Sequence, residues 1–175
     1  MSLEATLAAI QAVESEFGAY DEALVFLRQA RIRGRRAFFI GNGGSAAIAS
    51  HMATDFQNRA KLTCTAMNDL AALTAISNDY GYKFVFDFQL RQHAQPSDVL
   101  FAVSSSGKSP NIVEATYNAR HKYDLGVITF SGFAPNNPLR GYGHVNFYVP
   151  SADYGVVETT HLAILHTLLE RLADG

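Results

Sequence analysis

The stretch DVLFAVSSSGKSP, residues 98–110, decides the fold class. Its first six residues form a short apolar run, which is typical of a buried strand, and they lead directly into the serine-rich turn SSSGKS (104–109). Ser109 and Pro110 suit the N-cap and the first position of a helix that we expect to end near residue 123. A buried strand, a polar turn and a helix make up the repeating unit of a parallel α/β sheet.

The same unit recurs along the chain. The apolar run RAFFIG ends in the turn GNGGS, and a helix is expected to follow from Gly44 or Ser45. The segment 82–94 fits either a strand, because it is aromatic, or a helix, because of its length. The other expected strands cover 61–66, 98–103, 126–132 and 144–150, and the expected helices cover 3–16, 21–32, 44–58, 68–79, 110–123 and 153–173.

This alternation predicts a doubly wound, mainly parallel sheet flanked by helices on both faces, a three-layer α/β fold of the flavodoxin or Rossmann type. The length of 175 residues suits a single domain over 1–175, with N-terminal helices within 2–33. Ligands of such sheets bind outside the carboxyl ends of the strands. The two polar turns are therefore expected at one edge of the sheet.

Composition narrows the function classes. The chain is 48% hydrophobic and 17% charged with a net charge of −2, so no basic surface for nucleic acid is expected. The one basic cluster, RIRGRR (31–36), fits a solvated helix end or an approach for an anionic substrate. No apolar run approaches the roughly 20 residues of a membrane span, and the N-terminus lacks the pattern of a signal peptide. With Cys64 as its single cysteine, the protein is expected to be cytoplasmic.

Both polar turns carry the groups that bind phosphate. Phosphate binds to free backbone N–H groups, to hydroxyl donors and to the positive end of a helix. Glycine lets a backbone come close, and serine adds a donor without bulk. The predicted phosphate- and substrate-binding residues are Asn42, Gly43, Gly44 and Ser45 in the first turn and Ser104, Ser105, Ser106 and Ser109 in the second.

The first turn matches a dinucleotide fingerprint only in part. GNGGSA can be aligned with Gly-x-Gly-x-x-Ala, but residues 60–67 lack the acidic side chain expected about 20 residues on. SSSGKS also lacks the first glycine of a nucleotide-binding P-loop. A small phosphorylated molecule is therefore the expected ligand, and a dinucleotide enzyme is the disfavoured alternative.

Two helices carry histidines and carboxylates at helical spacing. His51 and Asp55 are four residues apart and share one helix face, while Glu158 and His166 lie about 80° apart in projection and can border one cleft. His161 projects away from His166. These groups suit either a zinc-type ion with an open position or acid–base chemistry on a sugar. A surface ion pair and structural histidines would produce the same spacing, so the residues alone leave the choice open.

Together the motifs resemble a known family. GNGGSAAIASHMATD (41–55), SNDYG (77–81), SSSGKSPNIVEA (104–115) and ETTHLAILH (158–166) are similar to the sugar isomerase (SIS) domain and, within it, to the phosphoheptose isomerases. The resemblance covers nearly the whole chain. It implies isomerisation of sedoheptulose 7-phosphate to D-glycero-D-manno-heptose 7-phosphate through an enediol, towards heptose precursors of lipopolysaccharide or capsule. It also implies a homotetramer with sites between subunits, and one zinc or other divalent metal per site.

The resemblance assigns residues by position. These are the substrate-contacting turn (Asn42, Gly43, Gly44), the phosphate loop (Ser104, Ser105, Ser106, Ser109), a sugar-contacting pair (Asn78, Asp79) and two metal-site histidines (His51, His166).

Two positions depart from the family pattern. The catalytic glutamate is replaced by Asp55, which is shorter by about 1.5 Å, and a glutamine that contacts metal and substrate is replaced by Glu158. Asp55 is the expected base with Glu158 as the second candidate, and His166 is the expected acid–base group at the sugar oxygens. The predicted metal ligands are His51, Asp55, Glu158 and His166.

These departures keep two alternatives open. One is a non-catalytic SIS protein that binds a sugar phosphate or a protein partner. The changes to Asp55 and Glu158 would suit a site that no longer catalyses a reaction. The other is an isomerase of a different phosphosugar, such as a pentose or hexose phosphate.

Overall fold

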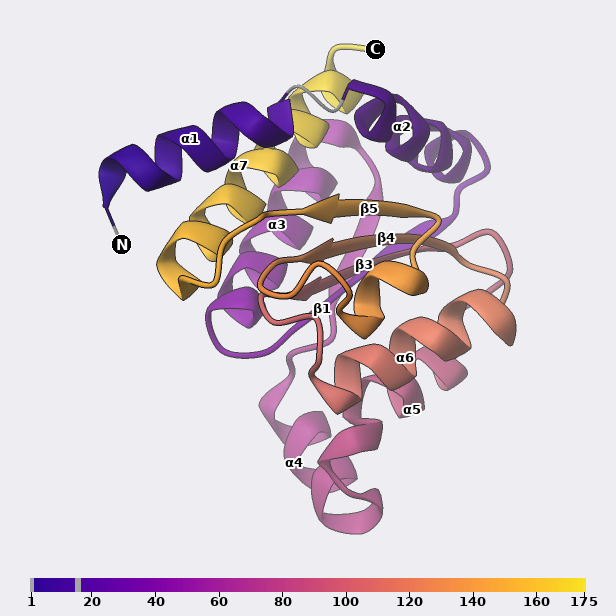
Figure 1. Ribbon diagram of the computed structural model, residues 1–175. Coiled ribbons are helices and arrows are strands. Elements are labelled where there is room, and N and C mark those ends of the chain that lie inside the picture. The colour runs from indigo at the N-terminus through magenta and orange to yellow at the C-terminus, as the bar shows by residue number, and fades with distance from the viewer. Residues whose placement is uncertain (1, 15–16) are drawn as a thin grey trace.

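A central sheet lies between two groups of helices (Figure 1). The computed structural model describes residues 2–14 and 17–175. Within them the strands form a five-stranded sheet in the order β2-β1-β3-β4-β5, and every neighbouring pair is parallel. The strands are β1 (Arg36–Gly41), β2 (Thr63–Ala66), β3 (Val99–Ser104), β4 (Gly126–Ser131) and β5 (Val145–Tyr148).

The strand order confirms the predicted doubly wound sheet. From β1 the chain passes to β2 on one side and then returns to β3 on the other, so the direction of winding reverses between β1 and β3. Open α/β sheets bind ligands at such a switch point, outside the carboxyl ends of the two strands. The turns that follow β1 and β3 are the two that the sequence singled out.

Helices cover both faces of the sheet. Helices α1, α2, α3 and α7 pack on one face, and α4, α5 and α6 lie on the other (Figure 1). Their bounds are α1 (Leu3–Glu14), α2 (Phe17–Ile32), α3 (Gly44–Ala60), α4 (Leu70–Tyr80), α5 (Val85–His93), α6 (Pro110–His121) and α7 (Tyr154–Ala173), with short 3₁₀ turns η1 (Tyr82–Phe84) and η2 (Pro138–Gly141).

Several element boundaries differ from the sequence-based expectation or complete it. Helix α2 begins earlier than predicted because Tyr20 is buried against Phe147, with ring centroids 5.0 Å apart. The ambiguous segment 82–94 forms η1 and the helix α5. The first helix ends at Glu14, and residues 15 and 16 of its predicted range lie outside the described residues.

Alternate strand residues point into two separate cores. On the α3 and α7 side, Phe39 and Phe101 stack with centroids 4.3 Å apart, whereas Phe38 and Leu100 point into the core beneath α5 and α6. The inner strands β1, β3 and β4 are buried on both faces, which agrees with their apolar sequences and holds their carboxyl ends in fixed positions. No helix of the described residues is long and apolar enough to cross a membrane.

Candidate active site

The glycine turn after β1 exposes the start of α3. Gly43 is the N-cap of α3 and has φ +55°, a left-handed conformation that favours glycine, and no side chain caps the helix. The first N–H groups of an α-helix have no partner within the helix, and they carry the positive end of its dipole. The backbone of Gly44 and Ser45 therefore offers donors to an anion or a polar group.

The serine loop after β3 is closed by its own contacts. The Gly107 N–H donates to the Ser104 carbonyl at 3.0 Å, and the Ser104 hydroxyl donates to the Ser109 hydroxyl at 3.4 Å. Ser109 occupies the N-cap position of α6, as predicted, and Pro110 follows at the first helical position. The Ser109 hydroxyl makes no capping bond to the helix. The hydroxyl therefore points towards the loop and does not cap α6.

Both turns line one cavity of about 240 Å³ at the switch point. Ser45, Ser104 and Ser105 are nine-tenths or more buried there. The cavity contains all eight of the predicted turn residues and three others: its lining is Asn42, Gly43, Gly44, Ser45, Val103, Ser104, Ser105, Ser106, Ser109, Tyr154 and Glu158. The structure thus brings the two turns together, as a shared ligand would require.

A pair of amides, half-buried Asn42 and buried Asn111, joins the first turn to the start of α6. Asn42 Nδ2 donates to Asn111 Oδ1 and Asn111 Nδ2 donates to Asn42 Oδ1, both at 2.9 Å. The Tyr82 hydroxyl also donates to Asn42 Oδ1, at 2.8 Å. Asn42 therefore fixes the cavity wall as well as lining it. Sequence reasoning missed Asn111 and Tyr82; the position of Asn111 directly after the start of the helix that follows the serine loop was the available signal.

Glu158 enters the same cavity from α7. The Ser105 hydroxyl donates to Glu158 Oε1 at 3.4 Å, and a β-carbon on Gly44 would lie 2.3 Å from Glu158 Oε2. A side chain at position 44 would therefore require the Glu158 carboxylate to move. The carboxylate thus lies between the serine loop and the first turn of α3.

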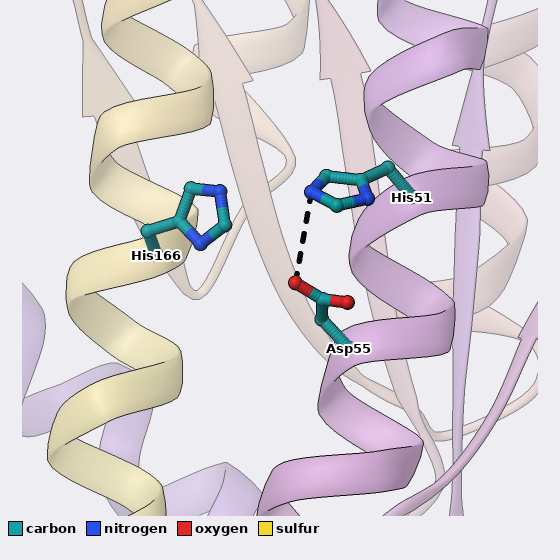
Figure 2. Close-up of side chains that lie close together, drawn as sticks. All are labelled: His51, Asp55 and His166. Atoms are coloured by element: carbon teal, nitrogen blue, oxygen red, sulfur yellow. Dashed lines mark ion pairs between the residues drawn. The ribbon is translucent and has the colours of Figure 1, made fainter.

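Further along the same two helices, His51, Asp55 and His166 form a cluster (Figure 2). One ligand atom from each lies within 4.8 Å of the others, and His51 Nε2 is 3.6 Å from Asp55 Oδ2. The rings of His51 and His166 have centroids 5.5 Å apart at an interplanar angle of 65°. Two imidazoles and one carboxylate match the three protein ligands of a catalytic zinc site with an open position. The donor set therefore fits the predicted metal.

Glu158 is not part of this cluster. It precedes His166 by two helical turns, which is about 12 Å along α7 at 1.5 Å per residue. His51 similarly lies about 10 Å along α3 from Gly44. Glu158 and His166 lie about 80° apart around α7, but the two turns between them keep Glu158 out of the cluster. Within the described residues, the cluster contains three of the four predicted metal ligands.

The ends of α3 and α7 beyond the cluster are joined by a bidentate ion pair. Arg59 Nη1 and Nη2 donate to the two carboxylate oxygens of Glu170 at 2.6 and 2.7 Å. The hydrogen bond from Arg59 lowers the pKa of Glu170, so the pair is charged at neutral pH. This exposed contact joins the two helices about one turn beyond Asp55 and His166.

The predicted sugar-contacting pair lies elsewhere in the chain. Asn78 and Asp79 are exposed near the end of α4, where Asn78 Nδ2 donates to Asp79 Oδ1 at 2.9 Å. Neither lines the cavity between the two turns. The fold of one chain therefore does not bring this pair to the cavity or to the histidine cluster.

Known proteins are similar to the chain in sequence and in fold. The profile of the SIS domain matches residues 3–132. A phosphoheptose isomerase from Maridesulfovibrio salexigens is 36% identical over 174 residues, 94% of this chain and 84% of the relative. A phosphoheptose isomerase from Solidesulfovibrio magneticus is 40% identical over 164 residues, which is 88% of this chain and 76% of the relative. The solved phosphoheptose isomerase from Neisseria gonorrhoeae superposes with a TM-score of 0.90 at 30% identity, covering 97% of this chain and 94% of that one.

Proposed function

Because this chain belongs to the SIS domain family, in the branch of the phosphoheptose isomerases, we propose that it isomerises sedoheptulose 7-phosphate to D-glycero-D-manno-heptose 7-phosphate. The chain is a phosphosugar isomerase. The single observation that supports this substrate is that a phosphate-type cavity and a His–Asp–His cluster lie along the same pair of helices, α3 and α7. A cavity with phosphate-binding groups lies at the start of α3, and a His–Asp–His cluster lies about 10 Å further along.

The spacing suits one extended substrate. A seven-carbon ketose has six carbon–carbon bonds of about 1.5 Å each, so its extended chain together with the phosphate ester spans about the same distance. The serine loop (Ser104–Ser109) holds the phosphate. The polyol runs along α3 and α7, and carbons 1 and 2 lie at Asp55 and His166. Binding energy from the phosphate thereby positions the reacting end.

Asp55 serves as the base. Its carboxylate takes a proton from carbon 1 of the ketose, which gives the enediol, and it returns a proton to carbon 2. The His166 imidazole moves the accompanying proton from oxygen 1 to oxygen 2, so the aldose carbonyl forms at carbon 1. Glu158, the other candidate base, lies beside the serine loop and too far along α7 to reach these carbons.

We assign His51, Asp55 and His166 as the ligands of zinc or another divalent metal. Such an ion, when bound, stabilises negative charge that develops on the sugar oxygens. This ligand set suits zinc because imidazole and carboxylate groups bind zinc together in catalytic sites. The partly exposed His51 and Asp55 leave the cluster open to substrate.

A homotetramer with sites between subunits is also part of the proposal, as is a cytoplasmic location. In this arrangement Asn78 and Asp79 reach the sugar from a neighbouring copy, which would explain why one chain leaves them outside the cavity. The exposed apolar side chains of the same region, Leu70, Tyr80 and Tyr82, are 73%, 56% and 53% exposed and support an interface there.

The test is turnover on a panel of ketose phosphates with five, six and seven carbons. We expect aldose product from sedoheptulose 7-phosphate and much slower turnover of the shorter sugars. Preferred turnover of a pentulose or hexulose phosphate would make the chain an isomerase of that sugar. Binding without turnover of any member would contradict the isomerase assignment and favour a non-catalytic sugar-phosphate-binding protein.

A further inference from the structure

The side-chain oxygen of Asn42 is fully used within the protein. An amide oxygen has two lone pairs, and Asn42 Oδ1 accepts Asn111 Nδ2 at 2.9 Å and the Tyr82 hydroxyl at 2.8 Å. Asn42 Nδ2 carries two hydrogens and donates one of them to Asn111 Oδ1 at 2.9 Å. Asn42 is half-buried and lines the cavity. Its second N–H is therefore the group that this side chain can offer to a ligand.

The orientation of the Asn42 amide is fixed from two sides. The Ile112 N–H, a main-chain group that can only donate, donates to Asn111 Oδ1 at 3.0 Å. This contact identifies the oxygen of Asn111, so Asn111 Nδ2 is the atom that faces Asn42 Oδ1. On the other side, the Tyr82 hydroxyl donates to the same oxygen. A turned-over Asn42 amide would lose both bonds and would present a carbonyl oxygen in place of the donor.

Tyr82 is held at this place by the turn that follows α4. Gly81 ends α4 with φ +91°, a conformation that favours glycine, and η1 begins with Tyr82. The next residue, Lys83, anchors η1 to α6, because its Nζ lies 3.0 Å from Glu114 Oε2. Helix α6 also carries Asn111. The same helix therefore positions both donors to Asn42 Oδ1.

Tyr82 is not itself a residue of the cavity wall. It is absent from the cavity lining, and its side chain is 53% exposed. Its hydroxyl therefore affects a ligand in the cavity only through Asn42. Replacing tyrosine by phenylalanine removes this hydroxyl and keeps the ring, so Asn42 Oδ1 would retain only the bond from Asn111.

We propose that Tyr82 is a positioning residue for the substrate. Its hydroxyl holds the Asn42 amide with the second N–H available to the cavity, and this N–H donates to an oxygen atom of the sugar. The inference rests on the proposed function for the identity of the sugar. The role of Tyr82 itself concerns binding and requires no turnover.

The experiment measures affinity by calorimetry in the Asp55→Asn protein, called the parent here, in which slow turnover preserves the sugar. Sedoheptulose 7-phosphate is the first probe, and inorganic phosphate, which lacks the sugar, is the second. Tyr82→Phe, Asn42→Ala and the combination of both are added to the parent. The matched control is Tyr117→Phe, which removes a partly exposed hydroxyl from α6, where the ring packs on His121 and Tyr142 outside the cavity.

We expect Tyr82→Phe to weaken binding of the sugar phosphate by about three- to tenfold, which is the effect of about one hydrogen bond. Phosphate affinity should stay unchanged, and Tyr117→Phe should bind both probes like the parent. In the Asn42→Ala background, Tyr82→Phe should have no further effect, because the hydroxyl acts through Asn42.

Three outcomes would overturn the inference. Equal affinity of the parent and Tyr82→Phe for the sugar phosphate would do so, even if Asn42→Ala did not fold. The same loss with and without the Asn42 side chain would show that Tyr82 acts by another route. An equal loss of phosphate affinity would show that the sugar is not the group concerned. No binding of the sugar phosphate to the parent would contradict the proposed function and remove this inference with it.

Discussion

The imidazoles of His51 and His166 face each other from α3 and α7, with ring centroids 5.5 Å apart (Figure 2). The Asp55 carboxylate completes the group, 3.6 Å from His51 Nε2. The two helices come from distant parts of the sequence and pack side by side on one face of the sheet. A cluster of this kind depends on the tertiary fold, and its chemistry can be tested independently of the substrate.

The first prediction concerns metal content. Purified protein loaded with zinc should hold about one ion per chain, because the cluster supplies three ligands and an open position. His51→Ala and His166→Ala should each lose most of this metal, measured by elemental analysis after dialysis. His121→Ala, which removes an exposed histidine at the end of α6, serves as the control and should keep it. Full metal content in both cluster variants would remove the ligand assignment.

The second prediction concerns the base. Asp55→Asn keeps the size of the side chain but cannot accept a proton, so turnover should fall by about 10²–10⁴-fold with an unchanged circular dichroism spectrum. Asp55→Glu restores the family's longer carboxylate and should stay active.

Asp21→Asn, on an exposed position of α2, is the matched control and should behave as wild type. Turnover of Asp55→Asn at the wild-type rate would show that a group other than Asp55 is the base.

The third prediction concerns the amide pair that joins the two turns. Asn111 is 2% exposed, and Asn111→Ala would leave Asn42 Nδ2 without its acceptor, while Asn42 Oδ1 would keep the Tyr82 hydroxyl. We expect the free energy of unfolding to fall by about 1–3 kcal/mol and KM for the sugar phosphate to rise.

Asn118→Ala on the same helix is the control. Asn118 is equally buried, but it donates to Asp87, outside the cavity. Its loss should reduce stability and leave KM unchanged. An equal rise of KM in both variants would mean that the amide pair has only a structural role.

The strands and turns could be predicted because their signals are local. The apolar run before SSSGKS and the glycines after β1 each specify an element and its boundary within a few residues. The segment 82–94 stayed ambiguous because its aromatic residues suit either structure. It forms a helix since Val85, Phe86 and Leu90 become buried beneath the sheet, a contact that no local pattern contains.

The candidate site could be predicted only in part. Helical spacing placed His51 with Asp55, but the position of His166 beside them follows from how α7 packs on α3. Glu158 and His166 share a helix face, yet the axial distance separates their surroundings. Asn111 was missed because a buried polar residue is recognised by its partner, and Asn42 is distant in sequence.

The fourth prediction concerns acid stability. His161 is fully buried, and its Nε2 lies 3.2 Å from the Ser131 carbonyl. Burial lowers the pKa of His161 from 6.5 to about 4. The unfolded chain therefore binds this proton at a higher pH than the folded chain. Neutral His161 contributes fully to the free energy of unfolding above pH 6.5, and this contribution is lost as the pH falls towards 4.

His161→Gln keeps a donor for Ser131 and cannot titrate. Urea unfolding at pH 7.5 and pH 5 should show that wild type loses about 2 kcal/mol more than this variant between the two values. If both proteins lost the same free energy of unfolding between pH 7.5 and pH 5, a group other than His161 would be responsible for the loss of stability in acid.

The most direct test of the account is a crystal structure of the Asp55→Asn variant with sedoheptulose 7-phosphate, in which slow turnover preserves the substrate. We predict that the phosphate lies on the serine loop, that hydroxyl groups lie beside Glu158, and that carbons 1 and 2 contact the side chains at positions 55 and 166. A phosphate bound elsewhere, or a sugar whose first two carbons lie away from both side chains, would contradict it.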